Sequence, residues 1–436
     1  MGVLGCPSFG HTGGRGPRPL RAPMRSPIST VVLLIAAWLA APTVEGFVGK
    51  FGLSLGRGLT AAPRKEGSFG RSVSGASAGP RMMLGPRKKV KLGGEWLSES
   101  ATKKEVDTLQ LNEGIVDGGR YAVCSQEGRG KGTQVGGPLN QDSATAGQLT
   151  EGMALLGVFD GHGQDGGTVS QYVAANLPPK IATIEDTLRR AGAKAELALG
   201  SLTDVFMECH KELCDPSSGV SAFISGSTGL TVCVMSDPGS KRLVVANAGD
   251  CRCVLASKGW GGKLTATQLS QDQNPDRADE RKRIEGLGGV VGMVDDAGDP
   301  PMVYSPDDVE QNGWDLGPAR VFWEDGTWDP PFHEFFPGLA MARSFGDQCL
   351  DELGVEPIPE VLIHTIKPKD KFMVIASDGV WQVLSNEEVV GAIAGNEDNV
   401  AQACEACVKL AAEKWDNQGG YRDDITCVLL TFDAPA

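Results

Sequence analysis

The chain has 436 residues, of which 41% are apolar, and its formal net charge is −14 at pH 7. This length and composition suffice for a sizeable hydrophobic core in one large domain or two. Residues 1–94 carry 14 Lys and Arg against two acids, a charge of +12, so the remaining residues carry −26. Such an acidic body excludes an extended nucleic-acid-binding surface, and we expect no nucleic-acid partner.

The first 94 residues resemble targeting sequence in two parts. Residues 31–41 form an apolar run that arginines precede and small residues follow, which is the layout of a signal peptide with cleavage near Gly46 and Phe47. The run is too short to span a bilayer comfortably. Residues 47–94 are rich in Gly, Ser, Arg and Lys and nearly free of acids, as organelle transit peptides are.

This tandem order resembles the two-part leaders of plastid proteins in algae, which implies a plastid location. Secretion, the endomembrane system and the cytoplasm stay open as alternatives. We therefore divide the chain into a signal-peptide-like segment at 1–46, a transit-peptide-like segment at 47–94 and a folded body at 95–436. We expect no stable membrane association of the mature protein.

The 11 cysteines are an odd number spread through predicted strands and helices, which is not a disulfide framework. This usage fits a reducing compartment. Cys404 and Cys407 form a C-x-x-C pair without a second pair, and they lie in a helical pattern. We therefore expect them to pack in the core rather than to bind zinc or perform redox chemistry.

The folded body begins with a predicted strand over 121–125 and a glycine-rich loop over 128–138. An apolar run at 155–159 predicts a buried strand. The amphipathic pattern of residues 185–213 fits one or two surface helices. Three strands are then predicted in quick succession, and their short connections indicate an antiparallel meander. Those strands cover 228–235, 242–246 and 251–256.

The second half of the body alternates helices with irregular sequence. Residues 275–287 predict a charged helix, whereas residues 292–337 show no clear periodicity and indicate a flap inserted in the domain. Ser385 and Glu388 have the spacing of a helix capping box. Residues 399–414 predict the last helix.

Acidic residues stand at the ends of three predicted strands. Asp160 follows the run at 155–159, and Asp378 follows a similar run at 371–376. Asp423 precedes an apolar strand at 425–432. The Asp-Gly sequence at Asp160 alone also fits a common turn. Because the C-terminal end of one antiparallel strand lies beside the N-terminal end of its neighbour, the repeated pattern instead favours three acids at one edge.

Such a cluster needs a cation or raised pKa values, because carboxylates about 4 Å apart repel by roughly 4 kcal/mol per pair at an effective dielectric of ~20. Oxygen ligands suit magnesium, manganese or calcium rather than zinc. The sequence therefore predicts a site for a hard divalent ion.

Seven motifs occur in the order found in one known family. They are Asn140–Asp142, Val158–Gly163, Ser225–Thr228, Val245–Asp250, Gly338–Asp347, Ala376–Trp381 and Asp423–Thr426. Over roughly residues 118–433 the chain resembles the metal-dependent protein serine/threonine phosphatases of type 2C. The sequence of its Gly338–Asp347 motif is most similar to the plant and protist branch.

The resemblance implies an α+β fold, in which a central sandwich of two antiparallel sheets is flanked by helices. It also implies a monomer that acts on phosphorylated proteins with two Mn²⁺ or Mg²⁺ ions at one end of the sandwich. Water activated by the two ions would attack phosphorus directly, and His162 would be the general acid.

The resemblance further implies the ligands of those ions. Asp160 would bridge both metals, and the carbonyl of Gly161 would bind one of them. Asp378 and Asp423 would hold the other metal. Asp142 would orient the water, and Asp250 matches a ligand of a third, weaker metal site.

Some positions depart from the family pattern. Gln141 replaces a glutamate and removes a charge at the second metal, although the plant branch shares this change. Gln382 replaces an acid that pairs with Asp250, which puts the third metal in doubt. The basic residue that grips the phosphate is not evident, and Arg129 and Lys131 are the candidates.

Other motif residues have structural interpretations. We expect Ser225–Thr228 to form a tight turn rather than to supply a nucleophile. Arg343 and Asp347 are expected to brace the site.

Two competing functions remain. The first is a catalytically silent relative that binds phosphoproteins or acts as a scaffold, and the glutamines at 141 and 382 motivate it. The second is a calcium-binding structural module, which is disfavoured because the acids lie on separate strands rather than in one loop.

Overall fold

The computed structural model describes residues 109–129, 140–295, 302–323 and 338–432. The expected signal-peptide-like and transit-peptide-like segments, and with them the plastid location, concern residues outside these ranges and stay predictions. Within the ranges, no helix combines the length and the apolar character that crossing a bilayer requires.

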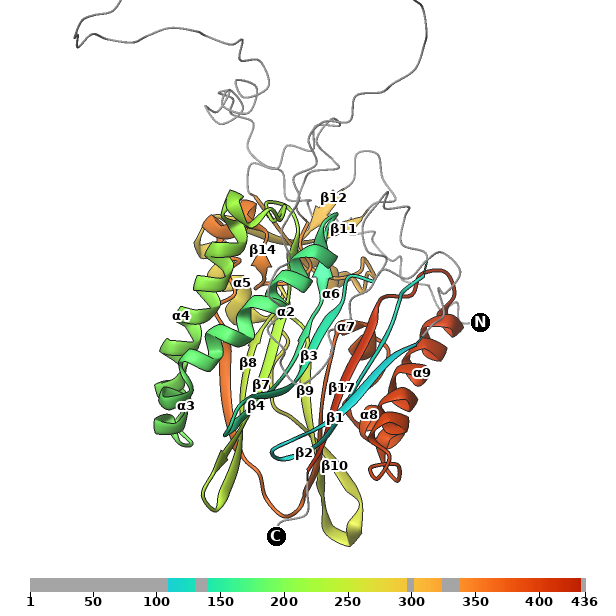
Figure 1. Cartoon of the computed structure of the whole chain (residues 1–436). Helices are drawn as coiled ribbons and strands as arrows, with labels where there is room; N and C mark the ends of the chain where they lie inside the picture. The colour runs from blue at the N-terminus through green and yellow to red at the C-terminus, as the bar shows by residue number, and fades with distance from the viewer. Residues whose placement is uncertain (1–108, 130–139, 296–301, 324–337, 433–436) are drawn as a thin grey trace, which may run out of the picture. The chain divides into compact units, whose positions relative to one another are not determined.

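Two antiparallel sheets pack face to face and form the centre of the molecule (Figure 1), as the resemblance implied. The six-stranded sheet runs β1 (Gln110–Val116), β2 (Gly119–Gln126), β17 (Ile425–Phe432), β16 (Asp370–Ala376), β9 (Arg252–Lys258) and β10 (Leu264–Gln268). The five-stranded sheet runs β15 (Glu360–Thr365), β8 (Ser240–Ala248), β7 (Gly229–Asp237), β4 (Met153–Phe159) and β3 (Ser143–Thr150).

Strand β4 shows why central strands of the sandwich have continuous apolar sequences. Leu156 and Val158 face the other sheet, where they join a core with Ile375 of β16. Met153 and Leu155 point the other way and pack under helices. Successive side chains of a strand face opposite sides, and both sides are buried here, so every position of β4 is apolar or glycine.

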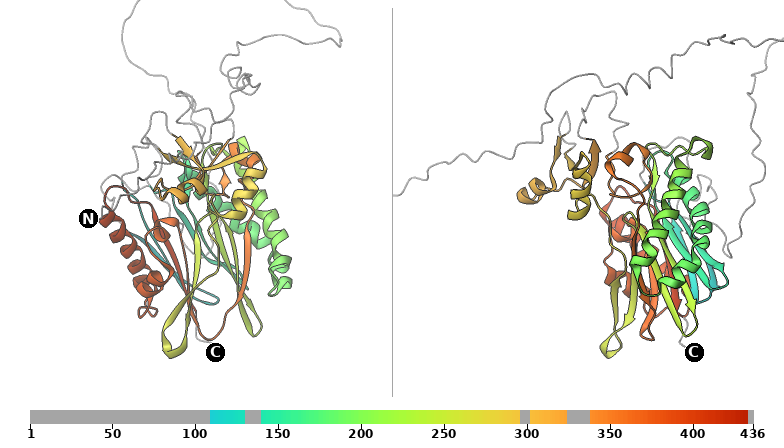
Figure 2. Two further views of the ribbon diagram at one scale, coloured as in Figure 1. Left: turned by 180° about the vertical axis from the view of Figure 1, so that it is seen from behind. Right: turned by 90° about the vertical axis from the view of Figure 1, so that its left-hand side faces the viewer.

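Helices cover the outer face of each sheet (Figure 2). The five-stranded sheet carries α2 (Gly166–Thr183), α3 (Glu185–Ala191) and α4 (Ala195–Cys214), and the six-stranded sheet carries α8 (Asn386–Ile393) and α9 (Val400–Gln418). The predicted capping box of Ser385 and Glu388 begins α8. Cys404 and Cys407 are free thiols buried between α9 and its sheet, so the expected core packing is confirmed.

The predicted meander of three strands is wrong at its third strand. β7 and β8 form a hairpin, but β9 pairs with β16 and β10 in the other sheet. The connection contains Gly249, whose φ of 116° suits glycine. A Cβ there would lie 2.6 Å from a methyl carbon of Thr228. This tight corner carries the chain across the sandwich.

The segment at 292–337 is more regular, in its described part, than its sequence indicated. It contributes to a small sheet of β11 (Gly289–Asp295), β12 (Met302–Tyr304) and β13 (Arg320–Trp323), with helix α6 (Pro306–Asn312) between β12 and β13. β12 and β13 have three and four residues, which is too short for a periodic pattern. Helix α5 (Ala278–Gly286) precedes this sheet and matches the predicted charged helix.

One buried carboxylate links the two sheets at the end where β15 turns into β16. Asp370 accepts hydrogen bonds from Ser257 Oγ at 2.6 Å and from the amide of Lys367 at 2.8 Å, and its Oδ2 lies 2.8 Å from Nε2 of His364. Burial acts to raise the pKa of Asp370, but the hydrogen bonds to His364 and Ser257 outweigh it and hold the pKa below its ordinary value.

We predict that Asp370→Asn lowers the free energy of unfolding by about 1–3 kcal/mol at pH 7, because it leaves buried donors without an anionic acceptor. A carboxyl whose pKa is depressed by folding stabilises above its unfolded pKa of about 3.9, and this stability is lost as the pH falls through the folded pKa. The gap between wild type and variant in urea unfolding should therefore shrink below about pH 4. A constant gap would contradict this account. Asp204→Asn, at an exposed position of α4, is the control and should change stability by less than about 0.5 kcal/mol.

Candidate metal centre

Four aspartates from separate segments meet at one end of the sandwich. Asp142 directly precedes β3, and Asp160 directly follows β4; the neighbouring pair Ser143 and Phe159 is in register. Asp378 begins the short helix α7 (Asp378–Trp381) after β16, and Asp423 precedes β17. Because β16 and β17 are also antiparallel neighbours, these two acids lie at the same edge.

The pKa of Asp160 reflects the charges of the other three aspartates. Burial raises the pKa of Asp160 well above its ordinary value, and the negative charges of Asp142, Asp378 and Asp423 raise it further. A hydrogen bond between Asp160 and Asp378 acts in the same direction. A divalent cation placed among these oxygens would replace repulsion by attraction.

The backbone around the cluster is fixed by hydroxyl groups. The amide of Asp160 donates to Thr228 Oγ1 at 2.9 Å, and the amide of Thr228 donates back to the Asp160 carbonyl at 2.9 Å. Ser377 Oγ donates to Asp142 Oδ2 at 2.8 Å, and it accepts the amide of Thr426 at 3.0 Å. The Ser225–Thr228 motif therefore supports the site, but Gly226 and Ser227 form a short strand, β6, rather than the predicted tight turn.

Asp424 makes different contacts from its neighbour Asp423. It is buried, and its two carboxylate oxygens accept the amides of Gly128 at 2.7 Å and Gln141 at 2.9 Å. These bonds tie both described ends of the glycine-rich loop to β17. Asp423 is left to face Asp160. Residue type alone could not predict this division, because the two acids are adjacent and identical.

Gln141 does not extend the acidic cluster. Its Nε2 donates to the carbonyl of Gly163 at 2.7 Å, so the side chain braces the loop after His162. Gly161 lies against the same loop, where a Cβ would be 2.4 Å from the Gly166 carbonyl oxygen and 2.6 Å from that of Gln141. Any side chain at 161 would push these segments apart, which explains the glycine that follows Asp160.

His162 is oriented by a carboxylate that lies 185 positions later in the chain. Its Nε2 is 2.6 Å from Oδ2 of Asp347, and that oxygen also accepts a hydrogen bond from Ser344 Oγ. Asp347 is buried and has a φ of 49°, the only positive φ of a non-glycine residue in the described ranges. Nδ1 of His162 is buried and has no hydrogen-bond partner among the described residues.

Asp250 lies beside the cluster in a cavity of about 440 Å³. Burial raises its pKa well above the ordinary value, followed by the charges of Asp378 and Asp272. Its Oδ1 is buried without a hydrogen-bond partner among the described residues. Gln382 lines the same cavity but donates from Nε2 to Asp378.

Of the two basic residues expected to bind the substrate phosphate, only Arg129 lies within the described residues. Arg129 pairs through its backbone with Arg422, next to Asp423, but its guanidinium lies 3.4 Å from Asp416 on α9. The structure therefore directs at least part of the Arg129 side chain toward α9. Lys131 lies outside the described residues and stays a prediction.

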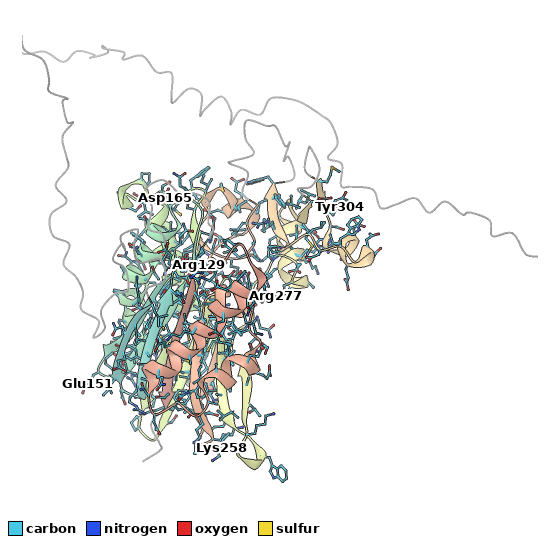
Figure 3. The ribbon with its side chains drawn as sticks, turned by 90° about the vertical axis from the view of Figure 1, so that its right-hand side faces the viewer. Arg129, Glu151, Asp165, Lys258, Arg277 and Tyr304 are labelled. Atoms are coloured by element: carbon cyan, nitrogen blue, oxygen red, sulfur yellow. The ribbon has the colours of Figure 1, made fainter. Side chains whose placement is uncertain are left out.

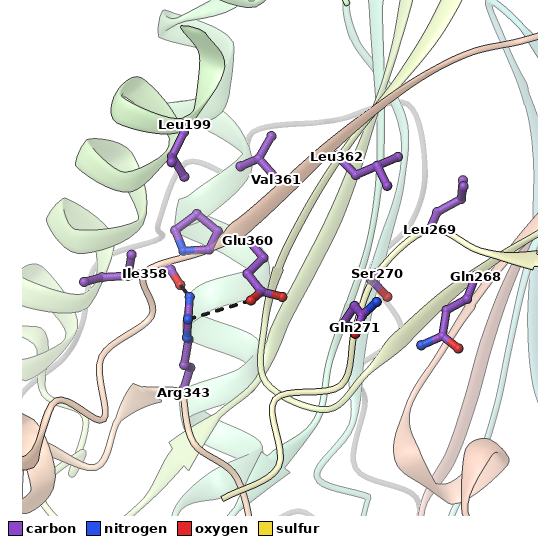
Figure 4. A pocket seen from close by; sticks show the side chains of 11 residues that line it. Leu199, Gln268, Leu269, Ser270, Gln271, Arg343, Ile358, Glu360, Val361 and Leu362 are labelled. Carbon is purple, nitrogen blue, oxygen red and sulfur yellow. Dashed lines mark hydrogen bonds and ion pairs between the residues drawn. The ribbon is translucent and has the colours of Figure 1, made fainter. Parts of the chain in front are cut away.

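A second acidic cluster in the described ranges is already neutralised. Asp279, Glu280 and Glu360 bring carboxylate oxygens within 4.8 Å of one another, yet they pair with Arg277, and Glu280 also pairs with Arg343. A groove of about 500 Å³ adjoins Arg343 and Glu360 (Figure 4) and is lined largely by apolar side chains such as Leu199 and Ile358. The contacts of Arg343 are therefore with this second cluster and the carbonyl of Ile358, whereas it was expected to brace the site.

The chemistry of the first cluster fits a hard divalent ion, although among the described residues no three of its carboxylates bring oxygens within 4.8 Å of one another. Its donors are all oxygens, which Mg²⁺ and Mn²⁺ prefer. The mutual repulsion that raises the pKa of Asp160, and the buried unpaired oxygen of Asp250, indicate that positive charge belongs there.

Comparison with known proteins agrees with this geometry. A model of the family described as protein phosphatase 2C matches residues 120–417. "Probable protein phosphatase 2C 72" of Arabidopsis thaliana is 33% identical over 316 residues, which cover 71% of this chain and 84% of that protein. "Probable protein phosphatase 2C 48" of Oryza sativa subsp. japonica is 33% identical over 337 residues, covering 72% and 84%. The crystal structure of a serine-threonine phosphatase 2C from Toxoplasma gondii has a TM-score of 0.57 at 20% identity, covers 75% of this chain and 100% of its own, and shows the same fold.

We predict that Mn²⁺ stabilises the wild-type protein against unfolding and that Asp160→Asn removes most of this effect. Binding at 100 times the dissociation constant contributes about 2.7 kcal/mol to the folded state. The measurement is the thermal midpoint with and without Mn²⁺. Glu360→Gln, in the arginine-neutralised cluster, is the matched control and should keep the full Mn²⁺ response. Loss of the Mn²⁺ response in Glu360→Gln but not in Asp160→Asn would contradict this prediction, because the ion would then bind at the cluster of Asp279, Glu280 and Glu360.

Proposed function

Because the chain belongs to the protein phosphatase 2C family and is a protein serine/threonine phosphatase, we propose that it cleaves phosphoserine and phosphothreonine by direct attack of water at a site for two divalent ions. Membership implies phosphoprotein substrates and dependence on Mn²⁺ or Mg²⁺. The observation that carries the proposal is the gathering of Asp160, Asp378 and Asp423 at one edge of the sandwich.

In this proposal Asp160, the carbonyl of Gly161, Asp378 and Asp423 would hold the two ions. Asp250 would help to hold a third, weaker ion. When bound, the ions supply positive charge to the phosphoryl oxygens and make a water molecule more acidic.

The protein's own residues then orient the reactants and move protons. Asp142, fixed by Ser377, accepts a hydrogen bond from the attacking water and directs it at phosphorus. His162 donates a proton to the departing serine or threonine oxygen as the P–O bond breaks. Asp347 accepts from Nε2 and stabilises the protonated imidazole, which leaves Nδ1 to carry the transferred proton.

No covalent phosphoenzyme is needed, and the hydroxyls of the Ser225–Thr228 motif are engaged elsewhere. Thr228 Oγ1 accepts the amide of Asp160, and Ser225 Oγ accepts the amide of Asp165 at 3.1 Å. Neither is paired with a histidine of the described residues that would activate it. Direct hydrolysis is therefore the simpler route.

The competing interpretation, a catalytically silent phosphoprotein-binding relative, rests on the glutamines at 141 and 382. Turnover of an aryl phosphate with Mn²⁺, abolished by EDTA, is the experiment that separates the two. Complete absence of turnover would favour the silent relative. Turnover that persists in EDTA would contradict the metal-dependent reaction.

We predict that His162→Ala lowers kcat for a phosphoserine peptide by about 10²- to 10⁴-fold, the usual contribution of general acid catalysis. An aryl phosphate should lose much less, because its phenolate leaves without a proton. Parallel assays of both substrates measure the difference. Equal losses would remove His162 from the acid role.

We predict that Asp347→Asn reproduces the same substrate dependence in weaker form, with KM little changed. Asparagine tolerates the left-handed backbone of this position, so the change tests the carboxylate rather than the fold. The double variant His162→Ala/Asp347→Asn should be no slower than His162→Ala alone, because Asp347 acts through the histidine. Additive losses would assign Asp347 a separate role. Glu352→Gln, an exposed position nearby in sequence, is the control.

A further inference from the structure

The hairpin of β9 and β10 ends in a tryptophan that is 100% exposed to solvent. Trp260 sits in a short 3₁₀ turn between Gly259 and Gly261, and glycine also follows at 262. The hairpin projects at the end of the sandwich away from the metal centre, where Figure 3 marks Lys258 far from Asp165 and Arg129. The ring of Trp260 contributes nothing to the hydrophobic core, so its full exposure needs another explanation.

Five exposed lysines lie on the hairpin that carries Trp260 and on the segment beside it. Lys258 and Lys263 lie on the hairpin, Lys367 and Lys369 lie on the neighbouring connection between β15 and β16, and Lys371 lies at the start of β16. The amide of Lys258 donates to the carbonyl of Lys369 at 2.7 Å, so the two segments are side by side. We call residues 258–263 and 366–371 together the Trp260 tip.

The Trp260 tip is positively charged on an acidic protein. Its one acid is Asp370, which is buried and bound to Ser257 and His364, and none of the five lysines forms an ion pair with a described acid. Residues 95–436 as a whole carry −26. Concentrated positive charge against this background fits an anionic partner.

The shape of the tip decides between kinds of partner. A stable protein interface buries about 800 Å² on each side and centres on a packed pocket. A hairpin end with one protruding ring offers neither feature. An aromatic ring that enters the headgroup region, with lysines that contact anionic headgroups, needs only such a convex end.

We propose that the Trp260 tip attaches the protein reversibly to membrane surfaces that contain anionic lipid. Trp260 enters the interfacial layer and the five lysines contact lipid headgroups. Strand β16 begins at Asp370, beside the tip, and ends at Ala376, just before Asp378, so attachment leaves the metal centre facing solution. Such contact is weak and salt-sensitive, in contrast to stable membrane association, which we did not expect.

The test is co-sedimentation of the full chain with vesicles of phosphatidylcholine alone and of phosphatidylcholine with about 30% phosphatidylserine. Each lysine near an anionic surface is worth about fivefold in affinity, so Lys258→Gln/Lys369→Gln should weaken binding about 25-fold. Trp260→Ala should weaken it about tenfold or more. Binding should also fall as salt is raised.

Matched controls separate the tip from the rest of the chain. Lys282→Gln on α5 and Trp314→Ala beside α6 remove the same residue types elsewhere and should bind as wild type does. All variants should keep wild-type turnover of an aryl phosphate, which reports an intact fold. Vesicles with bromine-labelled acyl chains should quench wild-type tryptophan fluorescence more than that of Trp260→Phe.

The vesicle assay can support the proposal or overturn it. Preference for phosphatidylserine that is lost in the tip variants and kept in the controls supports the proposal. Absence of vesicle binding, equal binding to both lipid compositions, or equal binding of wild type and tip variants would overturn it. The last result would assign the binding to the basic residues 1–94.

Discussion

Mutual repulsion among carboxylates held at one edge of the sandwich is the constraint on which the site depends. Asp160 is attached to a strand that is buried on both faces, so it cannot withdraw from Asp378 and Asp423 without disturbing the core. The register of β3 with β4 and of β16 with β17 fixes where the acids stand. The packing of the sheets thus maintains an arrangement that a bound cation makes more favourable.

Small polar groups convert this crowding into a defined geometry. Thr228 and Ser377 hold the backbone of Asp160 and the side chain of Asp142, and Asp424 fastens the loop that precedes Asp142. Asp347 does the same for His162 from a left-handed backbone position. Residues that touch no phosphate therefore determine where the reacting groups point.

The sequence predicted the parts of the fold that have local signals. The apolar runs of β4, β16 and β17, the capping box at Ser385 and the acids at strand ends all rest on neighbours in the chain. Helix α2 escaped prediction because it begins with Gly166 and Gly167 and contains Pro178 and Pro179, which local propensity disfavours in helices. The crossing of β9 to the other sheet was not predicted either, because a short connection has the same kind of sequence whether the next strand stays in its sheet or leaves it.

The finer features of the site depend on tertiary contact. The bond between His162 and Asp347 joins motifs 185 residues apart. Motif order indicated that both matter, but only the folded chain shows that they touch. Likewise, the separation of Asp423 from Asp424 is set by which side chain meets the amides of Gly128 and Gln141. The C-x-x-C pair was read correctly because its helical context has a local signature.

The most direct test of the account is anomalous diffraction from crystals grown with Mn²⁺. We expect anomalous peaks among the carboxylates of Asp160, Asp378 and Asp423, within coordination distance of their oxygens. An empty cluster in a crystal with Mn²⁺ bound elsewhere, or acids that turn away from one another, would contradict it.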